Sequence, residues 1–231
     1  MVFKSRTEAG RVLAGKLAPL ISKPSVVAAI PRGGVAVALP IVNQFKLPLT
    51  VAYARKLTAP IAPELAFGAI DEDGQAIIDT STAAILDLSP DDIEKAKARV
   101  AAEIKRRMAL YRVPPLADYL PGKAVVLVDD GLATGMTMRA AVAYARRHGA
   151  LEIIVAAPCA SEQAAERFQR EADHFVSLVV DPEFGAVGAY YLDFSPVPDE
   201  DVIRMLARAG GILPSDDTPR LLSSPQRGEA G

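Results

Sequence analysis

The sequence has few of the residues that build disulfides and metal clusters. Its 231 residues include one cysteine and two histidines. One cysteine cannot form an internal disulfide or a thiolate cluster, and two histidines give no basis for a zinc site. The formal net charge is only −2, which argues against a whole-molecule electrostatic grip on nucleic acid or on an anionic membrane. We therefore expect neither a disulfide scaffold nor a DNA-binding protein.

Long hydrophobic runs are also missing. No uncharged apolar run approaches the roughly 18 residues of a transmembrane helix. The chain start, MVFKSRTEAGR, reaches charged residues too early for a secretory signal. Half of the residues are hydrophobic and 23% are charged, a balance that supports a packed core and excludes global disorder. We expect a soluble, compact, cytoplasmic protein with no membrane partner.

Short runs rich in valine and isoleucine alternate with helical patterns along the chain. Such runs, mostly without polar alternation, are typical of strands that are covered on both faces. The alternation predicts an α/β fold with a doubly wound, mostly parallel sheet. The expected strands are Ser25–Ile30, Leu47–Ala54, Ala124–Val128, Leu151–Ala157 and Phe175–Val180, and the expected helices lie near residues 5–20, 34–45, 136–148 and 161–172.

A segment at about residues 56–88 interrupts this alternation. It carries two prolines and two glycines and has at most a short hairpin. A long irregular stretch inside a compact domain is typical of a functional flap, so we expect an inserted flap or hood here. A long helix is expected next, at about 89–112, because Ser89 can cap it and Pro90 suits its first turn.

The C-terminal end of the sequence differs in composition from the rest. Proline, serine and glycine dominate the tail at 211–231, and such a composition favours disorder. We therefore expect a single domain over residues 1–210, followed by a disordered tail.

The densest chemical pattern is AVVLVDDGLATGMT, residues Ala124–Thr137. A hydrophobic strand stops at Asp129 and Asp130, and adjacent carboxylates there are costly unless a ligand, metal or hydrogen bonds satisfy them. The backbone amides of the tight loop that enters the next helix form an anion site. The hydroxyls of Thr134 and Thr137 can donate to the same anion. The pattern predicts acceptors for vicinal hydroxyls beside a phosphate nest, as a sugar phosphate requires.

This motif points to a known family. It lacks the Gly-Lys-Ser/Thr ending of a Walker loop and is not the G-x-G-x-x-G dinucleotide fingerprint. VVLVDDGLATGMT closely resembles the signature of type I phosphoribosyltransferases, which bind 5-phosphoribosyl-1-diphosphate. The resemblance implies that Asp129 and Asp130 hold the ribose hydroxyls, directly or through Mg²⁺. It also implies that the 5′-phosphate lies in a loop made of Ala133, Thr134, Gly135, Met136 and Thr137.

Two other predicted strands end in residues that fit this family. The first ends in IPRGG, which looks like the family's diphosphate loop, with Arg32 and Gly33 beside the leaving group. The second ends in Arg55 and Lys56, where basic residues that grip diphosphate often lie in these enzymes. Taken singly, each cation is interpreted as a solvated surface residue, but their shared placement at strand ends favours diphosphate binding. The irregular segment that follows matches the family's mobile flap.

A further match lies at Asp181–Phe194, DPEFGAVGAYYLDF. It is similar to the base-binding stretch of hypoxanthine-guanine phosphoribosyltransferases, with one extra residue between the Val-Gly pair and Leu-Asp-Phe. The match implies that Phe184 stacks on the base, that Val187 presents backbone groups to its edge, and that Asp193 helps hold Mg²⁺. The same aromatic residues fit core or interface packing equally well.

The loop departs from the 6-oxopurine enzymes, which carry an aspartate at the position of Ala133. The alanine resembles the adenine and uracil enzymes, so the loop and the C-terminal stretch suggest different bases. The whole chain is most similar to bacterial phosphoribosyltransferases of undefined substrate. The resemblance thus implies an Mg²⁺-dependent enzyme of nucleobase salvage, with Asp129, Asp130 and Arg32 as catalytic residues and Asp129, Asp130 and Asp193 as metal ligands.

The implied partners are 5-phosphoribosyl-1-diphosphate and a small nitrogenous base, with a second copy of the chain as a possible partner. The main alternative is a regulator that keeps the fold and binds the donor or a nucleotide as an effector. The basic helix at 89–112 leaves an RNA-binding version of it open, and a hydrolase that uses water as acceptor is a third option. Retention of Arg32, Arg55 and Lys56 together with both acids favours the enzyme.

Overall fold

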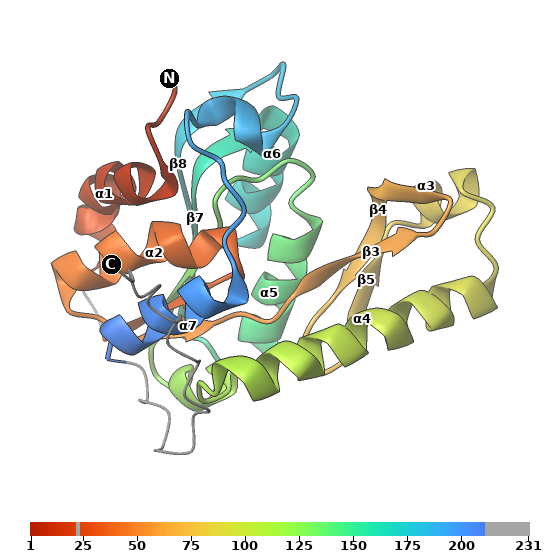
Figure 1. Cartoon of the computed structure of the whole chain (residues 1–231), viewed down its shortest axis with the longest axis horizontal. Coiled ribbons are helices and arrows are strands. Elements are labelled where there is room, and N and C mark those ends of the chain that lie inside the picture. Colours follow the sequence, from red (N-terminus) through yellow and green to blue (C-terminus); the bar gives the residue numbers. More distant parts are fainter. Residues whose placement is uncertain (22–23, 211–231) are drawn as a thin grey trace, which may run out of the picture.

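The structure is a computed structural model that describes residues 1–21 and 24–210. A compact body carries both ends of the described chain, and a long arm extends from one side of it (Figure 1). The tail predicted at 211–231 lies outside the described residues.

The body is built on a five-stranded parallel sheet with the order β2-β1-β6-β7-β8. Apolar side chains alternate between two core clusters, so that Val126 and Val128 of β6 lie in one cluster and Val125 and Leu127 in the other. This two-sided burial explains the short valine-rich runs and confirms the doubly wound α/β fold. The strands are β1 (Ser25–Ala29), β2 (Leu49–Val51), β6 (Ala124–Val128), β7 (Glu152–Ser161) and β8 (His174–Asp181).

Helices cover both faces of this sheet. The cluster that contains Val126 also holds side chains of α1, α2 and α7, and the opposite cluster holds side chains of α5 and α6. The helix α7 was not expected from the sequence. The helices of the body are α1 (Arg6–Leu17), α2 (Gly33–Phe45), α5 (Met136–Arg147), α6 (Glu162–Glu171) and α7 (Asp199–Arg208), and the short 3-10 turns are η1 (Ala18–Leu20), η2 (Leu116–Tyr119) and η3 (Val187–Tyr190).

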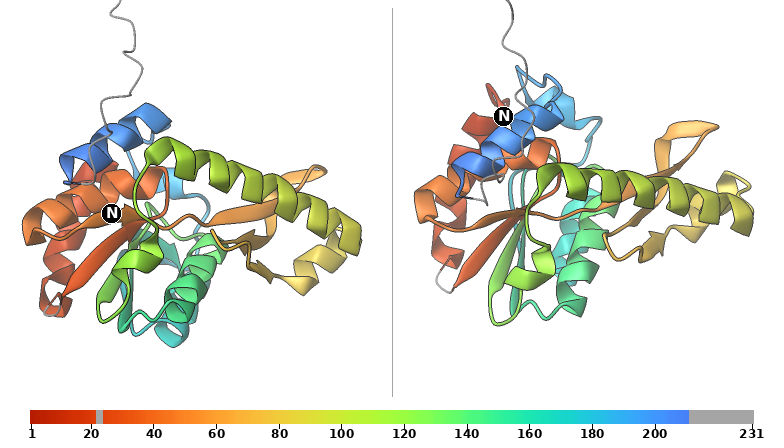
Figure 2. Two further views of the ribbon diagram at one scale, coloured as in Figure 1. Left: turned by 90° about the horizontal axis from the view of Figure 1, so that it is seen from below. Right: turned by 60° about the horizontal axis from the view of Figure 1, so that its bottom comes forward.

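The arm corrects the expectation of an irregular flap at 56–88. It contains an antiparallel sheet with the order β3-β4-β5, backed by the long helix α4 (Figure 2). The sheet forms because the segment has its own apolar partner: Leu57 and Phe67 are buried in one cluster with Val100 and Ile104 of α4. The elements are β3 (Arg55–Ala59), β4 (Ala62–Ile70), β5 (Ala76–Ile78), α3 (Thr80–Ile85) and α4 (Pro90–Tyr111).

The start of α4 agrees with the sequence prediction. The Ser89 hydroxyl accepts a hydrogen bond from the Asp92 amide, and the Ser89 amide donates to Asp92 Oδ2 at 3.1 Å. This capping box satisfies two amide groups that the helix itself leaves without partners. The buried residues of α4 follow the helical period as Ala96, Val100, Ile104, Arg107 and Tyr111. One of these five is charged.

The arm is tied to the body at two places. At the turn between β4 and β5, the buried Asp71 accepts a hydrogen bond from Arg147 at the end of α5 over 2.7 Å. At the end of α4, the Tyr111 hydroxyl donates to Asp199 at the start of α7 over 2.6 Å. These bonds hold the base of the arm against the sheet. Within the described residues, no helix is long and apolar enough to cross a membrane.

The packing of the arm leads to a stability prediction. Phe67 is 1% exposed between β4 and α4, whereas Leu65 on the same strand is 44% exposed. Phe67→Ala should lower the free energy of unfolding by about 3–5 kcal/mol, because it leaves a cavity in the core of the arm. Leu65→Ala is the matched control and should change it little. Urea unfolding measures both, and equal losses would contradict the packing described.

Candidate active site

Several segments meet at the carboxyl end of the parallel sheet around one cavity. Its volume is about 290 Å³. In open α/β sheets this end of the strands is where ligands bind. The structure brings together here both predicted acids, all four residues of the predicted diphosphate site and one threonine of the predicted phosphate loop. These lining residues are Arg32, Gly33, Arg55, Lys56, Asp129, Asp130 and Thr137.

The two acids that follow β6 lie in different electrostatic surroundings. Asp129 Oδ1 accepts a hydrogen bond from the Asp130 amide at 2.8 Å. Burial, and next the neighbouring charge of Asp130, raise the pKa of Asp129 well above its usual value. Asp130 Oδ2 instead accepts a hydrogen bond from Arg6 Nε at 2.7 Å. The pair therefore combines one carboxylate held by a cation with one carboxyl whose protonated form is favoured.

Arg6 is a site residue that sequence reasoning missed. Its guanidinium also donates to the backbone oxygen of Ser195 at 2.9 Å and lies 3.9 Å from the centre of the Phe194 ring. It thereby joins α1, the acid pair and the segment after η3. The sequence carries no signal for this role, because Arg6 stands alone in the first turn of a helix far from the motif.

The predicted phosphate loop leads directly into α5. Gly135 has φ 69°, in the left-handed region, and a Cβ there would lie 2.7 Å from the Phe168 ring. Only glycine fits such a position without strain. Two donors hold the loop from outside: Ser161 Oγ donates to the Ala133 oxygen at 2.6 Å, and Arg167 donates to the Thr134 oxygen at 2.9 Å. The amides at the N-terminus of α5 are thus presented by a braced loop, which suits an anion.

The loop after β1 lies directly against the acid pair. A Cβ on Gly33 would overlap the Asp130 side chain, and one on Gly34 would lie 2.6 Å from the Val128 oxygen. The Pro31–Arg32 peptide bond is cis. Glycine at these positions lets the loop that carries Arg32 approach the end of β6.

Arg107 of α4 is the second site residue that sequence reasoning missed. It lines the cavity and is 8% exposed. Its Nε donates to Glu103 Oε1 at 3.0 Å, and Glu103 also lies 3.6 Å from Arg55. Burial, and next the charge of Arg107, lower the pKa of Arg55. A signal was available, because Arg107 falls within the helical stripe of α4 that includes Ile104 and Tyr111.

Comparisons with known proteins identify the family of this chain. A family model described as phosphoribosyl transferase domain matches residues 7–194. The chain belongs to the phosphoribosyl transferase domain family. It is 38% identical over 208 residues to two Mycobacterium tuberculosis proteins, "Putative phosphoribosyl transferase MT0597" of strain CDC 1551 and its counterpart Rv0571c of strain H37Rv. The match covers 90% of this chain and 47% of each relative, so the chain spans about half of their length.

A solved structure of the same shape is TT1426 from Thermus thermophilus. It is 40% identical to this chain, with a TM-score of 0.73. The match covers 90% of this chain and 99% of that one. The arm and the body therefore occur together in an experimentally determined relative.

The residues that the family resemblance assigns to the base lie beside the cavity, not in its lining. Phe184 stacks on Tyr190 with ring centres 4.9 Å apart. Val187 packs on the acid loop, because a Cβ on Gly131 would lie 2.5 Å from a Val187 methyl group. Tyr191 holds the same loop by donating its hydroxyl to the Asp130 oxygen at 2.6 Å. Base binding by Phe184 and Val187 stays a prediction.

The three predicted metal ligands of a phosphoribosyl transferase do not form one group. Asp129 and Asp130 line the cavity, whereas the exposed Asp193 accepts hydrogen bonds from the Ser195 amide and hydroxyl at 3.0 and 2.7 Å. The Ser195 hydrogen bonds lower the pKa of Asp193. Over residues 1–21 and 24–210, no three carboxylate, imidazole or thiol groups gather as a metal site. Only the acid pair is thus positioned to meet a ligand in the cavity.

The raised pKa of Asp129 predicts a stability change with pH. A carboxyl whose pKa is higher in the folded state binds more protons there, so its stabilising contribution is present at low pH and is lost as pH rises through the folded pKa. Asp129→Asn should therefore be more stable than the unmodified protein at about pH 8, and the difference should shrink toward the ordinary aspartate pKa of about 4. Urea unfolding across this range measures it. A difference independent of pH would contradict the assignment.

Proposed function

We propose that this protein transfers the phosphoribosyl group of 5-phosphoribosyl-1-diphosphate to a nitrogenous base and releases diphosphate. The observation that carries this proposal is a single cavity, in a phosphoribosyl transferase domain, that is lined by the acid pair and by three cations of the diphosphate loops. Acids for ribose hydroxyls and cations for diphosphate are the two chemistries that this donor requires. Nucleobase salvage is the corresponding physiological setting.

The acid pair would hold the ribose. Arg6 keeps Asp130 as an anionic acceptor for one hydroxyl, while Asp129, whose protonated form is favoured, can both donate and accept. The 5′-phosphate would lie on the loop 133–137, against the amides at the N-terminus of α5 and beside Thr137. Both contacts fix the sugar with its anomeric carbon toward the cations.

The cations would stabilise the leaving group. Negative charge grows on diphosphate as the bond to the anomeric carbon breaks, so fixed cations bind the transition state more tightly than the ground state. Guanidinium groups suit phosphate oxygens because they donate two parallel hydrogen bonds. Arg32 reaches the cavity from the loop after β1, and Arg55 and Lys56 reach it from β3 of the arm. The arm thus contributes directly to the site.

Mg²⁺ fits the residues at the cavity. The carboxylates of Asp129 and Asp130 are oxygen donors, and Mg²⁺ commonly takes one or two protein carboxylates with the remaining positions filled by water and substrate phosphates. When bound, the ion would neutralise charge on the diphosphate. Asp193 lies outside the cavity lining, so the acid pair carries this proposal.

A regulator that binds the donor without transferring it is the second candidate. The packing of Val187 on Gly131 and of Phe184 on Tyr190 favours it, because these contacts use the side chains expected to receive a base. The retained cations Arg32, Arg55 and Lys56 favour the transferase, since a protein that only senses the donor has no leaving group to stabilise.

The donor assignment is tested by calorimetry with 5-phosphoribosyl-1-diphosphate and Mg²⁺. The unmodified protein should bind the donor, and Asp129→Asn combined with Asp130→Asn should abolish binding, because the ribose hydroxyls lose both carboxylates. Asp91→Asn combined with Asp92→Asn, at the far end of α4, is a matched control that removes two charges outside the cavity and should leave binding unchanged. Unchanged affinity in the first double variant would refute the ribose assignment.

A further inference from the structure

More positive than negative charge faces the cavity. Arg32 and Lys56 make no ion pair with any residue in the described part of the chain, and Arg55 and Arg107 share one carboxylate, Glu103. Glu103 also pairs with Arg106 on the outer side of α4. Asp130 is already paired with Arg6. Four cations thus converge with little compensation, an arrangement that costs stability unless a polyanion binds.

Arg107 is the most enclosed of these cations, and most of its hydrogen-bonding capacity is unused. Its Nε is bonded to Glu103, and its two terminal NH₂ groups have no hydrogen-bond partner among residues 1–21 and 24–210. Guanidinium has five N–H donors in a planar fork. An Arg107 that lines the cavity with both NH₂ groups free can donate to neighbouring oxygens of a phosphate group.

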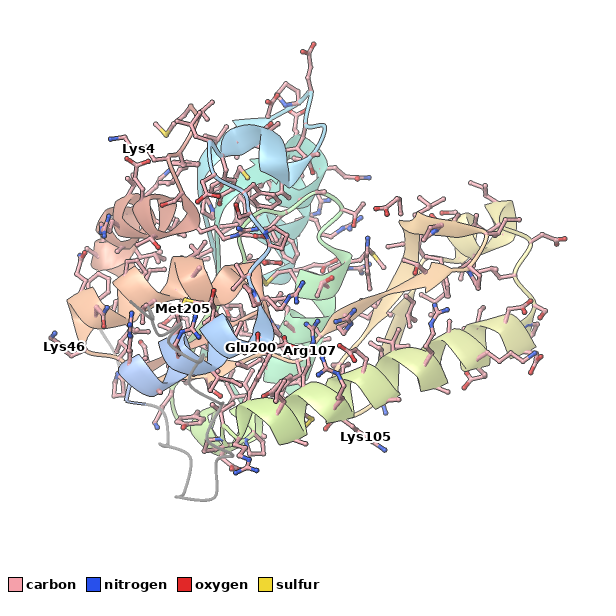
Figure 3. All side chains as sticks on the ribbon, in the orientation of Figure 1. Lys4, Lys46, Lys105, Arg107, Glu200 and Met205 are labelled. Carbon is pink, nitrogen blue, oxygen red and sulfur yellow. The ribbon has the colours of Figure 1, made fainter. Side chains whose placement is uncertain are left out.

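The surroundings of Arg107 hold it in place before any ligand arrives. One turn further along α4, Tyr111 donates to Asp199 of α7 and stacks on Tyr53 with ring centres 6.1 Å apart. Arg106 bonds to the same Asp199 at 3.0 Å. The end of α4 is therefore fixed to the body, and Figure 3 shows Arg107 on the inner side of the helix and Lys105 on the outer side.

We propose that Arg107 is a diphosphate-binding residue, a fourth cation that α4 adds to those of the loops after β1 and β2. This inference rests on the proposed function, because it assigns a further contact to the same donor. It gives α4 a role beyond support of the arm. With Arg55 on β3 and Arg107 on α4, one diphosphate would bridge the two layers of the arm to the body of the protein.

The test compares two probes, inorganic diphosphate and ribose 5-phosphate, each titrated by calorimetry into the full chain. Arg107→Gln should weaken diphosphate binding by at least about tenfold, because a charge-assisted hydrogen bond is lost. Ribose 5-phosphate, which needs the acid pair and the loop 133–137, should bind as before. Lys105→Gln is the matched control: it removes one positive charge from the outer face of the same helix and should leave both affinities unchanged.

The outcomes separate this inference from the proposed function. If Arg107→Gln binds diphosphate as tightly as the unmodified protein, the role of Arg107 is refuted and the proposed function stands. If Arg107→Gln weakens both probes and lowers the unfolding midpoint, Arg107 is structural and the inference is again refuted. If the unmodified protein binds neither probe, the proposed function fails together with the inference.

Discussion

The ion pair between Arg6 and Asp130 is the interaction on which the rest of the site depends. Strand β6 places two adjacent carboxyl groups at the edge of the core, and both cannot easily remain charged there. Arg6 compensates one, and protonation is favoured on the other. The same guanidinium bonds to Ser195 and stacks on Phe194. One side chain therefore stabilises the acid loop and fixes the segment that covers it.

Close packing between loops follows from this arrangement. Gly33 brings the loop with Arg32 against Asp130, and Gly131 lets Val187 approach the acid loop. A side chain at either position would push the segments apart. The cavity consequently stays small and polar, with acids on one wall and cations on the other. Such a wall-to-wall separation of charge suits a donor that has a sugar with two hydroxyls at one end and a diphosphate at the other.

Much of the body could be predicted from the sequence, because its signals are local. Runs such as Ala124–Val128 are buried on both faces, and the motif that follows them keeps its acids, glycines and threonines in order. The sheet of the arm was missed because its strands are stabilised by α4, not by an alternating pattern of their own. Arg6 was missed for a similar reason: its partner Asp130 is 124 residues away, and no local pattern announces such a contact.

Transfer itself is tested most directly by diphosphate release. The purified protein would be given 5-phosphoribosyl-1-diphosphate and Mg²⁺ with each of a panel of free bases, and released diphosphate would be followed over time. The account predicts that one base drives release well above the rate without a base, which would also name the acceptor. Donor binding without base-dependent release would contradict the transferase assignment and favour the regulator.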